Sequence, residues 1–341
     1  MKRQIPVVVV AGYLGSGKTT LLNHLLRNNG GTRIGVVVND FGAINIDSML
    51  VAGQVDSMVS LGNGCLCCAV DVSEMDGLFD RLTGPRSPID VIVVEASGLA
   101  EPKSLIRLVL GSENQRIAYG GLVELVDAAE FVDTRARHPE IDQHLQLADL
   151  IVLNKVDRID AEQLSFVSTS IAELVGAVPI YPTSNGVLDP ALLFDKPAVA
   201  EKPMVAEQLT LDQLIEHDHH DDHRHLHDGY DHVEFTAERP LDPRALIDFV
   251  EEPPRGLFRA KGFLAFAVAG ESRKFVLHVV GRHIRLQPTR WTRGERRVSQ
   301  LVLIGTGLDE ADIRNRLHAC VHPSPDLLDE NAMLNLQRYL I

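Results

Sequence analysis

One short segment near the N-terminus restricts the fold of this chain more than any other. Residues 12–19 read Gly-Tyr-Leu-Gly-Ser-Gly-Lys-Thr, a complete Gly-x-x-x-x-Gly-Lys-Thr motif. The motif follows an apolar run at 7–11 and opens an amphipathic stretch at 20–27, which is the strand-loop-helix context that a phosphate-binding loop requires. Backbone N–H groups of such a loop surround phosphates, its lysine reaches the terminal phosphates and its threonine hydroxyl can bind Mg²⁺. The residues predicted to bind the nucleotide phosphates are Gly12, Gly15, Ser16, Gly17, Lys18, Thr19 and Thr20.

The rhythm of apolar segments predicts the fold class. Strands are expected at 7–11, 34–39, 91–95, 121–127, 150–154 and 179–183, with amphipathic helices between them. This alternation is typical of an α/β domain with a mostly parallel sheet. From 232 onward the elements become shorter, with helices expected at 243–251 and 309–319, several strands between 257 and 286 and another at 300–304. That second pattern predicts a smaller α+β domain.

These patterns divide the chain into four parts. We expect a P-loop nucleotide-binding domain at 1–190, a linker at 191–231, an α+β domain at 232–322 and a helical tail at 323–341. Apolar residues recur in the tail at helical spacing, which suits docking on the nucleotide domain or on a partner.

A second motif selects the base of the nucleotide. Asn154, Lys155 and Asp157 form an Asn-Lys-x-Asp sequence at the end of an expected strand. An aspartate carboxylate can accept hydrogen bonds from both N1–H and the exocyclic N2–H of guanine, whereas adenine offers a different set of donors. The predicted nucleotide is therefore GTP. The backbone at 182–185 follows another strand and is expected to contact guanine O6.

Further polar residues follow the other expected strands. Glu95 ends the apolar strand 91–95, where P-loop NTPases place an acidic group for the Mg²⁺ shell, and the amide of Gly98 is expected to contact the γ-phosphate. Asp40 and Asp47 lie where GTPases keep their first switch, and either could help to hold Mg²⁺ or orient the attacking water. The predicted catalytic residues are Lys18, Glu95 and Asp40, with the division of roles between Asp40 and Asp47 left open.

Three of the four cysteines occur together between these motifs. Residues 62–68 read Gly-Asn-Gly-Cys-Leu-Cys-Cys, so Cys65, Cys67 and Cys68 place three thiols within about one turn of chain, and only Cys320 lies elsewhere. Thiolates are soft ligands, and three of them supply most of a four-coordinate Zn²⁺ or Cu⁺ shell. Neighbouring cysteines meet disulfide geometry poorly. The cluster therefore predicts a metal or redox site.

Taken in order, these motifs resemble the CobW-like GTPase metallochaperones. The resemblance rests on the P-loop, on Asn-Asp-Phe-Gly at 39–42, on the cysteine cluster, on Glu-Ala-Ser-Gly at 95–98 and on Asn-Lys-Val-Asp at 154–157. Segments 257–262 and 298–305 are similar to the C-terminal domain of that family. The resemblance implies slow GTP hydrolysis, binding of Zn²⁺ or Co²⁺ by the three cysteines, and transfer of the metal to a client metalloprotein or a cofactor-biosynthesis enzyme.

One difference from the family bears on the metal. The family's switch segment usually reads Asn-Glu-Phe-Gly-Glu, whereas this chain has Asp40 and Ala43. The second carboxylate is therefore missing, which favours a more sulfur-rich coordination and leaves the fourth ligand unassigned. Zinc is the favoured metal, and the alternative is a cobalt chaperone for cobalamin biosynthesis.

The linker adds a separate metal signal. Seven of the 14 histidines fall between 217 and 232, interleaved with carboxylates. Such side chains bind borderline divalent ions in many interchangeable ways, and a segment with so few apolar groups does not fold alone. We expect a flexible loop that collects metal through His217, His219, His220, His223, His225 and His227. Two other functions stay open: a GTP-dependent switch whose cysteines are structural, and a metal-storage protein that relies on these histidines.

Charge and composition restrict the partners. A formal net charge of −14 argues against nonspecific nucleic-acid binding, so the arginines around Trp291 are expected to form a local salt-bridged surface. The chain has no apolar run long enough for a signal peptide or a transmembrane helix, which predicts a cytoplasmic protein without membrane contact. No arginine is identifiable as an intrinsic arginine finger, so a client or a second subunit could supply one, and a homodimer is possible.

Overall fold

The computed structural model describes residues 4–38, 57–60, 72–84, 89–96, 101–194, 230–324 and 326–340. The chain divides into two compact units. Unit 1 comprises Met1–Gly120 and Thr183–Gly229, and unit 2 comprises Gly121–Pro182 and Tyr230–Ile341. The division falls inside the strand β5 (Ile117–Asp127), so it differs from the four parts expected from the sequence pattern, whose boundaries stay a prediction.

The strands of the first half form one sheet in the order β3-β2-β4-β1-β5-β6-β7. The pairs β1–β4, β2–β3, β2–β4, β5–β6 and β6–β7 are all parallel. This arrangement confirms the predicted α/β domain with a mostly parallel sheet. The strands are β1 (Ile5–Gly12), β2 (Ile34–Val38), β3 (Ser57–Ser60), β4 (Val91–Glu95), β5, β6 (Leu150–Asn154) and β7 (Ile180–Pro182).

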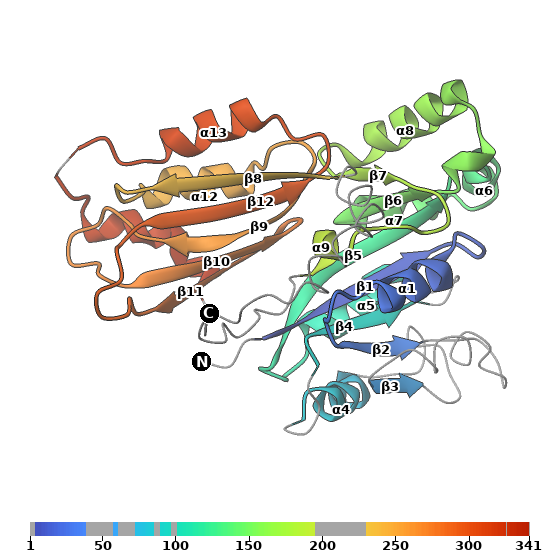
Figure 1. Cartoon of the computed structure of the whole chain (residues 1–341), viewed down its shortest axis with the longest axis horizontal. Coiled ribbons are helices and arrows are strands. Elements are labelled where there is room, and N and C mark those ends of the chain that lie inside the picture. The colour runs from blue at the N-terminus through green and yellow to red at the C-terminus, as the bar shows by residue number, and fades with distance from the viewer. Residues whose placement is uncertain are drawn as a thin grey trace, which may run out of the picture. The chain divides into compact units, whose positions relative to one another are not determined.

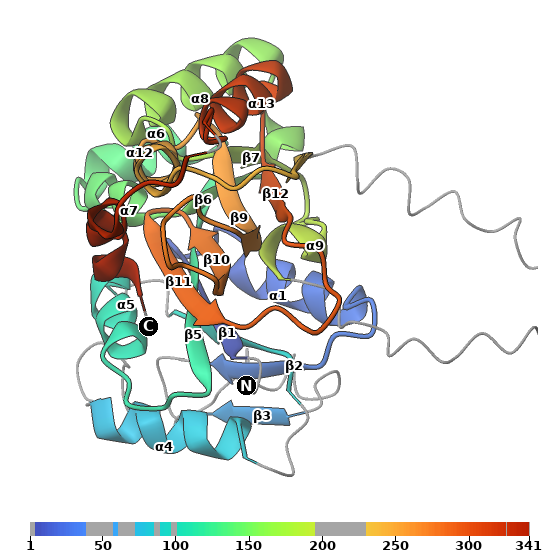
Figure 2. The same cartoon turned by 90° about the vertical axis from the view of Figure 1, so that its left-hand side faces the viewer.

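In unit 1, helices cover the sheet on both faces. Figure 2 shows α1 (Lys18–Arg27) and α5 (Pro102–Leu110) on either side of β1. A strand that is covered on both faces reads as a continuous apolar run, and the four consecutive valines of β1, Val7 to Val10, are fully buried. The unit also contains α4 (Val72–Leu82) and the short α9 (Pro190–Leu193).

Unit 2 contains β5 from Gly121 onward, β6 and β7, with their connecting helices. The helices are α6 (Phe131–Arg137), α7 (Ile141–Leu147), η1 (Val156–Arg158) and α8 (Ala161–Val175). α8 begins with a capping box in which the Asp160 carboxylate accepts the Gln163 N–H and the Gln163 side chain accepts the Asp160 N–H. Such a reciprocal pair satisfies two N–H groups that the first helical turn leaves without a helical acceptor.

The rest of unit 2 is an antiparallel sheet in the order β11-β10-β9-β12-β8 (Figure 1). The apolar side chains of its helices and the inward rows of its strands form one core, which confirms the predicted α+β domain. The elements are β8 (Asp231–Ala237), α12 (Pro243–Glu251), β9 (Leu257–Leu264), β10 (Lys274–Val280), β11 (His283–Thr289), β12 (Ser299–Gly305), α13 (Glu310–Ala319) and η3 (Glu330–Tyr339).

The C-terminal tail packs on the antiparallel sheet domain to which it belongs. It forms the 3₁₀ helix η3, whose Leu336 is fully buried in the core of the antiparallel sheet domain. The Tyr339 hydroxyl donates to Glu251 Oε1 at 2.7 Å, and Arg338 pairs with the same carboxylate. The tail thus packs against α12, which lies about eighty residues earlier in the sequence.

Two basic residues near Trp291, Lys274 and Arg296, form ion pairs. The Lys274 ammonium lies 3.7 Å from the Phe263 ring centre and 5.0 Å from that of Trp291, and it also pairs with Glu295. The hydrogen bond from Lys274 and the hydrogen bonds from Thr292 lower the pKa of the Glu295 carboxyl to about 2. Arg296 pairs with Glu238 at 3.1 Å.

Within unit 2, a glycine in the turn between β10 and β11 approaches the start of β6. Gly281 has φ +54, and a Cβ added there would lie 1.8 Å from Asp149 Oδ1 and 2.8 Å from Asp149 Cβ. The Asp149 side chain is buried and its Oδ2 accepts the Leu122 N–H at 2.9 Å, so it is not free to move aside. The two sheets of unit 2 therefore meet at a position where only glycine fits.

We predict that Gly281→Ala lowers the free energy of unfolding more than Gly270→Ala does. Both glycines have positive φ, but a Cβ at Gly270 meets nothing within 4 Å. The strained φ is common to both variants, and overpacking against Asp149 adds about 1–3 kcal/mol for Gly281→Ala alone. Urea unfolding of the two variants measures the difference, and equal losses would contradict the close packing at Gly281.

Candidate functional site

The P-loop joins the end of β1 to the start of α1. Gly17, the residue before the helix, has φ +107, a conformation that a residue with a Cβ rarely adopts. The Lys18 ammonium donates to the carbonyl oxygens of Gly12 at 2.9 Å and Tyr13 at 3.3 Å, and the side chain is buried. The loop thus holds a lysine charge beside the N-terminus of a helix, where the helix dipole also favours anions.

Thr19 and Glu95 meet although 76 residues separate them in the sequence. The Thr19 hydroxyl donates to Glu95 Oε1 at 2.9 Å, and Glu95 is only 3% exposed. One residue comes from the first turn of α1 and the other from the last position of β4. A hydroxyl and a carboxylate are hard oxygen ligands of the kind that Mg²⁺ prefers, so this pair fits the predicted magnesium site.

The predicted guanine motif lies in unit 2. Asn154 ends β6 and is buried, Lys155 has an unusual φ of +61, and Asp157 is exposed in η1. The Lys155 ammonium donates to Asp127 Oδ2 at 2.6 Å. Asp127 was not predicted as a site residue. It ends β5 directly opposite Asn154 in the parallel register, and its position at a strand end was the available signal.

The predicted base-contacting segment belongs to unit 1 and forms a tight turn. Asn185 and Gly186 have φ +55 and +63, and the Val187 N–H donates to the Ser184 carbonyl at 3.2 Å. Two central residues with positive φ define a type I′ turn, and Asn-Gly is the sequence that favours it most strongly. The Thr183 hydroxyl closes the loop by donating to the Val187 carbonyl at 2.5 Å.

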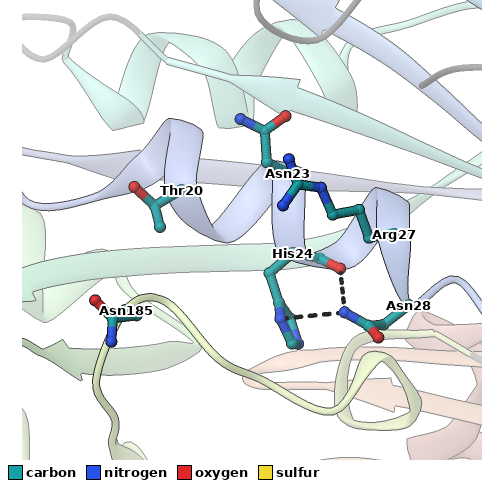
Figure 3. A pocket seen from close by; sticks show the side chains of 6 residues that line it. All are labelled: Thr20, Asn23, His24, Arg27, Asn28 and Asn185. Atoms are coloured by element: carbon teal, nitrogen blue, oxygen red, sulfur yellow. Dashed lines mark hydrogen bonds between the residues drawn. The ribbon is translucent and has the colours of Figure 1, made fainter. Parts of the chain in front are cut away.

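A pocket of about 350 Å³ opens between this turn and α1 (Figure 3). Sequence reasoning did not find it, although its helical residues recur at the spacing of one helix face. Burial lowers the pKa of His24, the most buried titratable group among them, below its ordinary value, against the opposing effect of a hydrogen bond to Leu188. The lining residues are Thr20, Asn23, His24, Arg27, Asn28 and Asn185.

Several predicted site residues lie outside the residues that the structure describes. They are Asp40, Asp47, Gly98, the cysteines Cys65, Cys67 and Cys68, and the histidines His217, His219, His220, His223, His225 and His227. Within the described ranges, no group of three or more His, Cys, Asp and Glu side chains is placed to hold a metal ion. The described Cys320 is buried, and burial raises the pKa of its thiol to about 11.

In the part of the chain that the structure describes, no helix is both long enough and apolar enough to cross a membrane.

We predict that Glu95→Gln weakens Mg²⁺-dependent GTP binding and leaves the fold intact. The amide oxygen can still accept the Thr19 hydroxyl, but the negative charge beside the cation is lost. Loss of a group that supports a metal typically costs about 10- to 100-fold in metal affinity. Mg²⁺ titrations of GTP binding measure the effect, and Glu101→Gln, at an exposed carboxylate six residues later, is the matched control. An unchanged Mg²⁺ affinity in Glu95→Gln would contradict the assignment.

Two family models match the chain. Residues 6–182 match the CobW/HypB/UreG nucleotide-binding domain, and residues 230–321 match the cobalamin synthesis protein cobW C-terminal domain. Zinc chaperone CobW of Pseudomonas aeruginosa is 34% identical over 93% of this chain and 92% of its own length. Zinc chaperone YjiA of Escherichia coli is 28% identical over 91% and 96%. A crystal structure of Zn(II)-bound YjiA GTPase from E. coli covers 94% of this chain and all of its own, with 23% identity and a TM-score of 0.45.

Proposed function

The chain belongs to the CobW/HypB/UreG family, and we propose on that basis that it is a GTPase metallochaperone that delivers zinc to a client protein. The observation that carries the proposal is the contact between Thr19 and Glu95 near Lys18 in the matched nucleotide domain, which supports a phosphate and magnesium site there. The relatives named zinc chaperones match along more than nine tenths of the chain, including the antiparallel sheet domain.

The proposed reaction is hydrolysis of GTP to GDP and phosphate. In-line attack of water on the γ-phosphoryl group spreads negative charge over its oxygens, and Lys18 and the P-loop amides are proposed to stabilise that charge. Bound Mg²⁺ would add charge neutralisation at the β- and γ-phosphates. Glu95 fixes the Thr19 hydroxyl by accepting its hydrogen bond. Asp157 is proposed to accept the guanine N1–H and N2–H, and Asp40 to orient the attacking water.

The metal cargo is proposed to bind at Cys65, Cys67 and Cys68, with zinc favoured over cobalt. These cysteines lie in the sequence between the switch segment and Glu95, so a rearrangement around the γ-phosphate can move the thiol ligands. The histidines of the 191–231 linker are proposed to collect metal with low specificity. The proposed client is a metalloprotein or a cofactor-biosynthesis enzyme in the cytoplasm, and a homodimer is a further proposal.

We predict that Lys18→Ala lowers the rate of GTP hydrolysis by on the order of 100- to 1,000-fold, because one positioned donor to the transition state is lost. The variant is expected to fold, because the hydrogen bonds of Lys18 to Gly12 and Tyr13 lie within one loop. Phosphate release measures the rate and circular dichroism checks the fold. Lys103→Ala, at an exposed lysine of α5, is the control. Hydrolysis that persists in Lys18→Ala would show that the phosphate site lies elsewhere.

We predict that Zn²⁺ binds more tightly with Mg·GTP than with Mg·GDP. By linkage, zinc must then tighten GTP binding relative to GDP by the same factor, which is typically about 5- to 150-fold. Competition titrations with a chromophoric chelator measure both affinities. Changing Cys65, Cys67 and Cys68 to serine should remove the nucleotide-dependent site, whereas deleting 216–231 should remove only weaker binding. Equal zinc affinities in the two nucleotide states would contradict coupled transfer.

A further inference from the structure

A histidine of α1 is hydrogen-bonded to the loop that follows β7. His24 Nε2 lies 3.0 Å from the carbonyl oxygen of Leu188, a residue 164 positions later in the sequence. Both residues belong to unit 1. Leu188 is fully buried, and Asp189 after it caps α9 by accepting the Ala191 N–H at 2.8 Å. The residue that accepts the His24 hydrogen bond is therefore held in place by its own packing and by the helix that follows it.

The partners of the imidazole determine its tautomer. A backbone carbonyl can only accept, so Nε2 carries the proton and donates to Leu188. In the neutral ring Nδ1 is then the acceptor, and Asn28 Nδ2 lies 3.2 Å from it (Figure 3). Asn28 Nδ2 also donates to the His24 carbonyl at 3.0 Å, so the residue at the end of the helix orients the ring. Both nitrogens of the neutral imidazole are thus used.

A second contact holds the same loop against the same helix. A Cβ added to Gly186 would lie 2.8 Å from the Leu21 nitrogen and 3.0 Å from its Cα. These are backbone atoms of α1, which cannot move aside as the end of a side chain can. The turn that contains Asn185 therefore rests on the helix at Gly186, and the His24 hydrogen bond holds the same loop again at Leu188.

We infer that His24 is a positioning residue for guanine recognition, because it holds the 183–188 loop on α1. The inference rests on the proposed function, in which the backbone of 182–185 contacts guanine O6. The same helix carries Lys18 and Thr19 at its N-terminus, so it sets the positions of the phosphate-binding groups and of this base-contacting turn together. His24 itself need not touch the nucleotide.

The inference differs from a purely structural role in what it predicts for base selectivity. A histidine that only stabilises the fold would affect all nucleotides equally. A histidine that positions the O6 contact affects discrimination at O6 and leaves discrimination at the 2-amino group, which is assigned to Asp157, unchanged. Two analogues separate these contacts: 6-thio-GDP replaces O6 by a weakly accepting sulfur, and IDP lacks the 2-amino group.

The experiment measures dissociation constants of GDP, 6-thio-GDP, IDP and ADP for the full chain and for His24→Ala. Wild type is expected to bind GDP most tightly. In His24→Ala the preference for GDP over 6-thio-GDP falls about three- to tenfold, the range expected when one net hydrogen bond is lost, while the ratio of GDP to IDP is kept. His24→Gln, whose Nε2–H can reach Leu188, is expected to restore the preference.

Two further variants make the test independent of His24 folding effects. Gly186→Ala pushes the turn away from α1 without altering the histidine, and the same loss of O6 discrimination is expected. Arg27→Ala removes another side chain from the same pocket and should leave both ratios unchanged. An equal loss for all nucleotides in His24→Ala, or a loss in Arg27→Ala as large as in His24→Ala, would overturn the inference. Wild type that binds ADP as tightly as GDP would instead refute the proposed function, and the inference with it.

Discussion

The parallel pairing of β1 with β4 is the constraint on which the phosphate site depends. In this register Val10 lies opposite Glu95, and the Ala96 N–H donates to the Val10 carbonyl at 2.8 Å. Both strands therefore end at the same edge of the sheet, where β1 turns into the P-loop and β4 presents its carboxylate. The helix that starts after the loop then brings the Thr19 hydroxyl to within 2.9 Å of Glu95.

The apolar interior of the sheet fixes this register. Both strands are apolar on both faces, so a slip of one residue is costly mainly through the charged Glu95 at the end of β4, which would move among buried apolar side chains. Val7 to Val10 of β1 and Val91 to Val94 of β4 are fully buried, and the only charged residue of either strand, Glu95, lies at the edge. A buried carboxylate is costly unless it accepts hydrogen bonds, and the Thr19 hydroxyl supplies one. Packing energy and site geometry are thus set by the same pairing.

Sequence reasoning succeeded where a pattern is local and failed where a contact joins distant segments. The P-loop and the long apolar strands were predictable because spacing and periodicity within about ten residues determine them. β3 was missed because Ser57-Met-Val-Ser60 is short and shows no alternation. The ion pair between Lys155 and Asp127 was missed because it depends on which residue of β5 lies opposite Asn154, and this register is a property of the folded sheet.

Helix α1 shows where local prediction reaches its limit. Leu21, Leu22, Leu25 and Leu26 are buried, so the 3.6-residue period places Thr20, Asn23, His24 and Arg27 together on another part of its surface. The helical side of the pocket was therefore predictable from the sequence. The other side was not, because the position of Leu188 depends on β7 and on the Asn185–Gly186 turn. Only glycine lets that turn approach the Leu21 backbone closely enough for the Leu188 carbonyl to meet His24. The helix period determines where His24 lies on α1, and the preference of Asn-Gly for a tight turn determines the shape of the loop. The hydrogen bond between His24 and Leu188 forms only when folding brings the two together.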